Sequence, residues 1–188
     1  MAAVALGGSW PPGDAHPDSD LELGIYYQPG RPPSVEECTD LRKSSTTSHL
    51  PNLATKSGEW GPWINGGGWL WVDGRSVDWL YRDAGKVAAT VERCLSGQTA
   101  CHYQPGHPHG FHEHIYLGEV HYCRALHDPE GLLSELKSAV AAYPAKLKHS
   151  IIEKGLWEAE FSLEVARKPA ARGRPPMYPD ACFGVWPA

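Results

Sequence analysis

Two acidic residues, Asp20 and Glu22, stand two positions apart in a stretch where apolar and polar residues alternate. Side chains at positions i and i+2 of a β-strand leave the same face, so both carboxylates would point the same way. Two anions held so closely repel each other, and a divalent cation between them would relieve the repulsion. Magnesium suits such oxygen ligands and completes its octahedron with water and substrate phosphates. The pair therefore predicts a cation site.

A third acidic residue, Asp78, lies between Val77 and Trp79 in a segment that otherwise has the composition of a buried strand. A carboxylate among apolar neighbours is costly unless it is paired or bound to a metal. Three carboxylates around two magnesium ions are suited to phosphoryl transfer, because the ions acidify the attacking hydroxyl and stabilise the in-line transition state. The plainer interpretation is that the acidic pair only keeps an exposed edge strand soluble.

A glycine-rich turn precedes the acidic pair. Residues 2–7 form a short apolar run typical of a buried strand, and Gly7-Gly8-Ser9 ends it. Glycine lets backbone amides approach an anion, and successive N–H groups in a turn form a nest for phosphate. A Gly-Ser turn, a spacer, an acidic pair and a later acidic strand together favour a nucleotide site.

The remaining pattern predicts the elements that must position these residues. Strands are expected at 2–7 and 20–27 and in a hairpin whose two arms, 69–73 and 76–82, are joined by Asp73-Gly74. Helices and loops follow from capping, periodicity and composition. The expected helices are 34–43, 83–95, 112–126, 129–142 and 145–168, and the expected loops are 44–59 and 97–111.

Strands come first along the chain and helices later, an order that predicts the α+β class. We expect a small mixed β-sheet core with helices on one face over residues 1–96. A helical C-terminal segment would occupy residues 97–172, and an irregular tail residues 173–188.

The same residues resemble the nucleotidyltransferase superfamily, the polymerase β-like fold, and within it bacterial domains similar to kanamycin nucleotidyltransferase. The family pattern is a hydrophobic residue, a Gly-Gly or Gly-Ser turn, a spacer, an acidic-x-acidic pair and a later acidic residue on a strand. Further likeness lies in the segments around these motifs, and the resemblance covers residues 2–172. The segments are 18–27, 65–74, 77–83 and 107–111.

The resemblance implies a role for each matched residue. Gly8 and Ser9 would hold the nucleotide phosphates, and Asp20 and Glu22 would bind two magnesium ions. Asp78 would complete the second metal site and help to activate the acceptor hydroxyl. In the antibiotic-modifying members a glutamate of the helical half serves as base, and Glu119 is the matching candidate here, against the plainer reading of a helix-surface carboxylate.

Three features depart from the family. The family has a helix before the first strand, whereas this chain starts at the strand. After the Gly-Ser turn the family continues into a helix, but Trp10-Pro11-Pro12-Gly13 cannot form an ordinary helical turn. The last helix breaks at Gly173, where the family's helical domain would go on. These departures keep open a protein with the fold and little or no activity.

Histidines and cysteines gather between residues 101 and 123, which raises a zinc site as a rival. His112 and His114 would diverge on the expected helix, so a loop with His107 or His109 touching the nucleotide or acceptor is favoured. Four tryptophans near the hairpin would pack on the sheet or stack on a nucleobase. They are Trp60, Trp63, Trp69 and Trp71.

Bulk composition narrows the function classes. The net charge is −5, and no basic stretch would follow a nucleic-acid backbone. No apolar run is long enough for a membrane span, and the first six residues lack the basic start of a signal peptide. Five cysteines without a Cys-x-x-Cys pair are typical of reduced thiols, so we expect a cytoplasmic protein.

We therefore expect a magnesium-dependent nucleotidyltransferase that moves a nucleoside monophosphate, AMP from ATP, onto a hydroxyl of a small molecule or protein. The alternative is a weakly active or inactive nucleotidyltransferase-fold binding protein, similar to an antitoxin, with a helical protein as partner.

Overall fold

The computed structural model describes residues 1–34, 53–104 and 107–173. It is an α+β structure, as the order of elements predicts. The strands are β1 (Ala3–Leu6), β2 (Leu21–Tyr27), β3 (Leu53–Ala54), β4 (Gly67–Val72), β5 (Arg75–Asp83), β6 (Cys101–Gln104), β7 (His107–His112) and β8 (Arg124–His127). The helices are α2 (Ala84–Leu95), α3 (Ile115–Tyr122), α4 (Leu132–Ala139) and α5 (Ala145–Ala170).

The main sheet of the described residues is mixed and has the order β3-β4-β5-β2-β1-β8. Its central pair, β2 and β5, is parallel, and every other pairing in it is antiparallel. The register of the parallel pair places Glu22 opposite Asp78 and Tyr26 opposite Arg82. β6 and β7 form a separate two-stranded antiparallel sheet.

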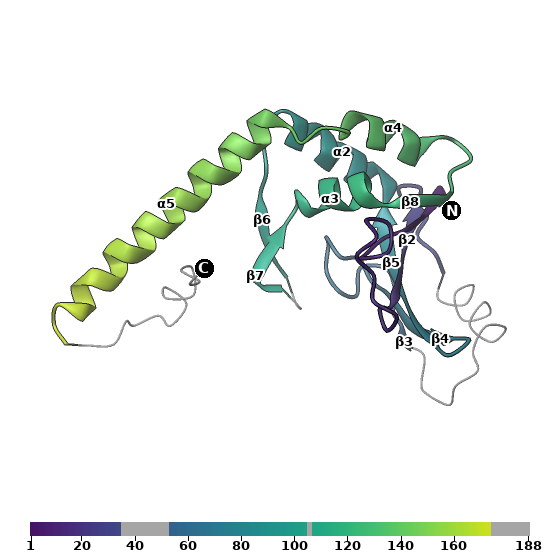
Figure 1. Cartoon of the computed structure of the whole chain (residues 1–188), viewed down its shortest axis with the longest axis horizontal. Helices are drawn as coiled ribbons and strands as arrows, with labels where there is room; N and C mark the ends of the chain where they lie inside the picture. The colour runs from purple at the N-terminus through teal and green to yellow at the C-terminus, as the bar shows by residue number, and fades with distance from the viewer. Residues whose placement is uncertain (35–52, 105–106, 174–188) are drawn as a thin grey trace.

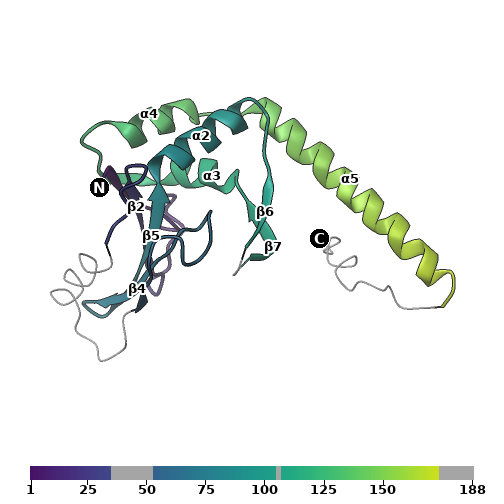
Figure 2. The same cartoon turned by 180° about the vertical axis from the view of Figure 1, so that it is seen from behind.

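The main hydrophobic core lies between one face of this sheet and the helices. Ala3, Ala5 and Tyr26 contribute from the strands, and buried residues of α2, α3 and α4 cover them. Figures 1 and 2 both show these three helices gathered over one end of the sheet, while the β4–β5 hairpin extends beyond them. The three helices therefore cover only one end of this face.

Two features were predicted correctly from local signals. The expected hairpin is confirmed, and its turn residues Asp73 and Gly74 have φ values of 49° and 76°. Aspartate and glycine tolerate this left-handed conformation, which explains their presence in the turn. The side chain of Asp83 accepts a hydrogen bond from the amide of Lys86 at 2.9 Å and caps α2, also as expected.

The region after α2 differs from expectation. Residues 97–111 were expected to be a loop but contain β6 and most of β7. Gly110 permits this pairing because a Cβ at that position would lie 2.1 Å from Sγ of Cys101. Glycine and proline in this region indicated a loop, but here they lie in or beside two short strands that approach each other closely.

The helix expected at 112–126 is also partly wrong, because α3 ends at Tyr122 and the chain then becomes strand β8. β8 pairs with β1 and covers an edge of the main sheet that would otherwise be open. The predicted helical segment therefore contains three strands. The expected loop 44–59 likewise contains β3, and the expected helix 34–43 lies outside the described residues apart from Ser34.

Helix α5 confirms the expected helix at 145–168 and follows Pro144, which stands at its N-cap. The helix expected at 129–142 is present as the shorter α4. Among the helices of the described residues, none is both long and apolar enough to cross a membrane.

Candidate functional site

The three acidic residues singled out by the sequence come together on the face that the helices cover only in part. Glu22 and Asp78 are register partners on the parallel pair β2–β5, so their side chains leave the same face. Asp20 precedes β2 directly, and its charge raises the pKa of both partners. The sequence spacing thus produces a cluster of carboxylates.

This cluster carries electrostatic strain. Partial burial is the largest cause that raises the pKa of Glu22 above its ordinary value. Three neighbouring carboxylates raise it further: Asp20, Glu119 and Asp78. Burial, followed by the charge of Asp20, also raises the pKa of Asp78. The cluster would therefore gain from a proton or a cation.

The predicted glycine turn lies against this cluster. Gly8 has a φ of 65°, and a Cβ there would lie 2.9 Å from both Cδ and Oε1 of Glu22. The amide of Gly7 donates to the carbonyl of Glu22 at 2.8 Å. Within the described part of the chain, no hydrogen bond uses the amides of Gly8 and Ser9. These two N–H groups are therefore available to an anion beside the carboxylates.

The segment Trp10–Gly13 forms turns and no helix. The indole Nε1–H of Trp10 donates to the carbonyl of Asp20 at 2.7 Å. The guanidinium of Arg75 lies 5.3 Å from the Trp10 ring centroid, within range of a cation–π interaction. The tryptophan thus joins the glycine turn to the start of β2 and the β4–β5 hairpin.

A cavity of about 230 Å³ adjoins the acidic cluster between the sheet and α3. Gly24 and its register partner Leu80 both belong to its lining. Charged and polar side chains from β2, β5 and α3 line it, together with Gly7 and Gly8 of the glycine turn. These side chains are Glu22, Arg82, Glu119 and Tyr122.

Arg82 is the one lining residue with a permanent positive charge, and its side chain is only 3% exposed. Its Nε and Nη2 donate to the two carboxylate oxygens of Glu119 at 2.8 and 2.7 Å. Burial alone would lower the pKa of Arg82, but the charge and hydrogen bonds of Glu119 raise it overall. The pair attaches α3 to β5 beside the cavity.

Glu119, on α3, lines the same cavity as Glu22. Both of its oxygens accept hydrogen bonds from Arg82, which holds the carboxylate in one orientation. Its role as the catalytic base stays a prediction, and the two hydrogen bonds from Arg82 favour a role in positioning.

Two tryptophans flank the cluster on the open side. Trp69 is the cross-strand partner of Asp78 and is 50% exposed, and Trp71 is also exposed. The Trp60 and Trp69 rings lie 4.6 Å apart. Directly opposed residues of an antiparallel pair share a face, so an exposed indole surface stands beside the carboxylates. Such a surface can stack on a nucleobase.

Carboxylate oxygens are suitable donors for magnesium, yet the cluster is not a complete metal cage. In residues 1–34, 53–104 and 107–173, no group of three His, Cys, Asp or Glu side chains is arranged to hold a metal ion. Magnesium is commonly held by one or two carboxylates, with substrate phosphates and water as its other ligands. The donors around Glu22 fit magnesium that arrives with a nucleotide.

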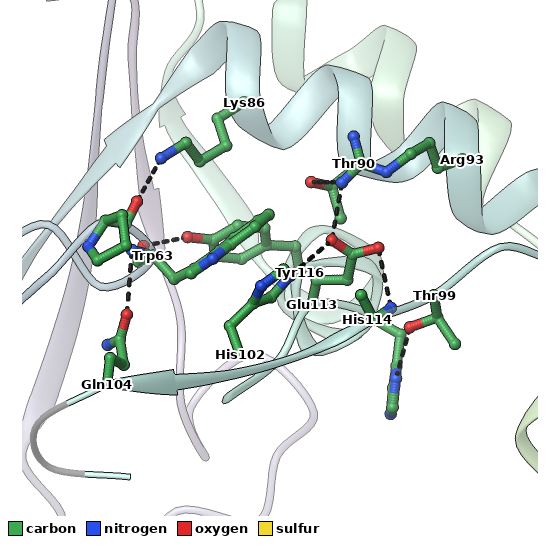
Figure 3. A network of polar contacts seen from close by, with 12 residues as sticks. Trp63, Lys86, Thr90, Arg93, Thr99, His102, Gln104, Glu113, His114 and Tyr116 are labelled. Atoms are coloured by element: carbon green, nitrogen blue, oxygen red, sulfur yellow. Dashed lines mark hydrogen bonds and ion pairs between the residues drawn. The ribbon is translucent and has the colours of Figure 1, made fainter. Parts of the chain in front are cut away.

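The histidines that raised the zinc rival make other contacts. The carboxylate of Glu113, which is 2% exposed, accepts from Arg93 at 2.8 Å and from the Ala100 amide at 3.1 Å, and lies 3.2 Å from His102 Nε2. The His102 ring stacks on Trp63 at 4.0 Å. Figure 3 shows this network joining α2, β6 and the start of α3.

Other histidines of the cluster also have contacts away from a shared site. His114 Nδ1 lies 3.2 Å from Thr99 Oγ1, and His121 Nδ1 lies 2.9 Å from the carbonyl of Val140. His107 packs edge-on to Phe111, and His109 is exposed on β7, so neither lines the acidic cavity. The predicted contact of His107 or His109 with nucleotide or acceptor stays a prediction.

Sequence reasoning did not single out Arg82 or Glu113. Arg82 had a signal, because it stands four residues after Asp78 on a strand and therefore shares its face. Glu113 had none, since its burial depends on α2 and on the unexpected β6–β7 sheet. Burial would raise the pKa of Glu113, but Arg93 and His102 lower it overall.

Comparison with known proteins does not assign the chain to a family. No protein-family model matches the chain, and no curated protein was found to match it. The resemblance to nucleotidyltransferases therefore stays a prediction carried by these residues.

We predict that Glu22→Gln raises the thermal midpoint at neutral pH. The pKa of Glu22 is raised in the fold, so the stability linked to its protonation is present at low pH and is lost as the pH rises through the folded-state pKa. The difference from the wild type should shrink below about pH 4, where unfolded-state carboxyls are protonated. Differential scanning fluorimetry over a range of pH measures this difference in thermal midpoint. The same change at exposed Glu92 on α2 is the control. Equal shifts of the thermal midpoint in the two variants would contradict the claim that the charge of Glu22 destabilises the fold.

We also predict that Arg82→Leu destabilises the chain by about 2 kcal/mol, less than the 3–5 kcal/mol typical of fully buried pairs because Glu119 is a third exposed. The loss arises from a carboxylate left without its cation. Adding Glu119→Leu should recover much of it in urea unfolding. Losses that simply add in the double variant would show that the two side chains are not coupled.

Proposed function

We propose that the chain is a magnesium-dependent nucleotidyltransferase acting on a nucleoside triphosphate, with ATP as the expected donor. One observation carries the proposal: the carboxylate of Glu22 lies beside Asp78 on parallel strands and against the glycine turn at Gly8. Carboxylates next to unused backbone amides form the two halves of a metal-phosphate site. A solubilising acidic edge would need neither the glycine turn nor the central position of β2 in the sheet.

Each residue of the site then has a distinct task. The amides of Gly8 and Ser9 would hold phosphate oxygens, and the exposed indoles of Trp69 and Trp71 would offer a stacking surface to the base. Asp20, Glu22 and Asp78 would hold magnesium, which would acidify the acceptor hydroxyl and neutralise the triphosphate. The glycine turn and the exposed tryptophans thus take part in nucleotide binding from either side of the acidic cluster.

In the proposed reaction the acceptor hydroxyl oxygen forms a bond to the α-phosphorus of the nucleotide. The bond from that phosphorus to the bridging oxygen breaks, and pyrophosphate leaves with its electron pair. The hydroxyl proton passes to a carboxylate oxygen of Asp78, the third acidic residue of the cluster. Glu119, held by Arg82, would position the acceptor in the cavity.

The second candidate is a binding protein that keeps this fold with little activity. Two observations favour it: Trp10–Gly13 form turns where a helix would offer its N-terminus to phosphate, and the apolar residues of α5 are exposed. Such a protein would engage a helical partner. Nucleotide transfer separates the two candidates directly.

We predict transfer of label from α-labelled ATP, in the presence of magnesium, to an acceptor within a panel of aminoglycosides and cellular proteins. Asp20→Asn and Asp78→Asn should each lower transfer on the order of a hundredfold or more, because each removes charge that faces the metal and phosphates. Asp73→Asn in the β4–β5 turn is the matched control, since asparagine tolerates the same φ.

Calorimetry of ATP binding with and without magnesium completes the test. Magnesium-dependent binding without transfer to any acceptor would favour the binding protein. No binding and no transfer would remove both nucleotide roles and leave the fold unaffected.

A further inference from the structure

Helix α5 presents apolar side chains that nothing in the described part of the chain covers. It has 26 residues, of which only Leu147 is buried. Ile152, Leu156 and Leu163 are 49%, 61% and 51% exposed. Figures 1 and 2 show the helix leading away from the sheet and the other helices. A helix this long needs a partner for its apolar side, because helices in proteins gain most of their stability from packing.

The exposed apolar residues of α5 lie on two sides of the helix, and one side follows a coiled-coil spacing. Successive apolar positions are separated by four, three, four, three and four residues, which keeps them on one narrow stripe of the helix. The stripe, here called the α5 seam, consists of Ile152, Leu156, Ala159, Leu163, Ala166 and Ala170. Large residues occupy its first half, and alanines dominate its second half.

We propose that the α5 seam binds the same seam of a second copy of this chain, with the two helices antiparallel. Reversing one helix about a centre near residue 161 places every large residue against an alanine. Ile152 then faces Ala170 of the second copy, Leu156 faces its Ala166, and Leu163 faces its Ala159. Facing large and small residues fill the space between helices evenly.

A parallel pair in register would lack this complementarity. It would place leucine on leucine at 156 and 163 and alanine on alanine at 159 and 166, so that wide and narrow layers alternate. The antiparallel arrangement also sends the two sheet domains to opposite ends of the helix pair.

Charges beside the seam agree with the antiparallel arrangement. Glu153, Glu160 and Arg167 recur every seven residues along one flank of the seam. In the antiparallel pair this flank meets itself, so Glu153 faces Arg167 of the second copy, twice by symmetry, and Glu160 lies at the centre near its own copy. Flanking charges of this kind set the orientation of helix pairs.

These charged groups are free to exchange partners. Arg167 now pairs with Glu164 of its own helix at 2.5 Å, and both side chains are about two-thirds exposed. Exposed pairs within one helix are weak. Bringing up a second helix therefore costs little in broken contacts.

The opposite side of α5 provides a control surface. Trp157 and Phe161 stack with ring centroids 5.2 Å apart, and at 100° per residue they lie far from the seam. Val165 belongs to the same side and is 39% exposed. The seam from 152 to 170 is about 28 Å long, which gives a small interface, and we expect a dissociation constant in the micromolar range.

The first test measures the mass of the full chain by sedimentation velocity over a wide range of concentrations. We expect a reversible monomer–dimer equilibrium. Leu163→Glu should abolish the dimer because it places a charge against an alanine in the seam. Val165→Glu adds the same charge two residues away on the other side and should leave the dimer unchanged, and circular dichroism checks that both variants keep their helices.

The second test exchanges charges. Glu153→Arg and Arg167→Glu should each weaken the dimer about tenfold, since each change turns two attractive pairs into repulsive ones. The double variant should restore the wild-type affinity. The dissociation constants from the same sedimentation experiment measure this.

Three outcomes would overturn the proposal. Absence of a dimer at every concentration would mean that the seam serves another partner. A dimer that survives Leu163→Glu uses another surface. A double charge exchange that fails to restore affinity rules out the antiparallel register.

Discussion

The parallel pairing of β2 with β5 places a glutamate beside an aspartate, and the rest of the site depends on this contact. Like charges on neighbouring strands repel, and here Glu22 and Asp78 both have raised pKa values. The register of the two strands keeps the carboxylates close together. A register shift of one residue would turn each strand's apolar side chains to the wrong face. The fold thus holds together charges that only a proton or cation can relieve.

The buried guanidinium of Arg82 limits that repulsion on one side. Arg82 lowers the pKa of Glu22, against the effect of the carboxylates, but both oxygens of Glu119 engage its guanidinium. Its charge is therefore largely used in joining α3 to the sheet. The open side of the cluster, towards Gly8 and the exposed Trp69, keeps its excess of negative charge. This asymmetry would attract a cation to the open side.

The sequence predicted what depends on neighbours along the chain. Alternation identified β2, the Asp73-Gly74 turn identified the hairpin, and Asp83 identified the start of α2, since each feature is local. β8 and the β6–β7 sheet were not predicted because their pairing depends on distant or closely approaching backbone. In the site, the acidic cluster followed from spacing. The Arg82–Glu119 pair did not, because it joins elements 37 residues apart.

The central claim is that the acidic cluster and the glycine turn together hold a metal-nucleotide complex. Its most direct test is anomalous diffraction from a crystal containing manganese and a non-hydrolysable ATP analogue. The account predicts a manganese peak coordinated by Glu22 and by Asp20 or Asp78, with a phosphate on the amides of Gly8 and Ser9. Bound nucleotide with manganese at another place, or phosphates far from Gly8, would contradict it.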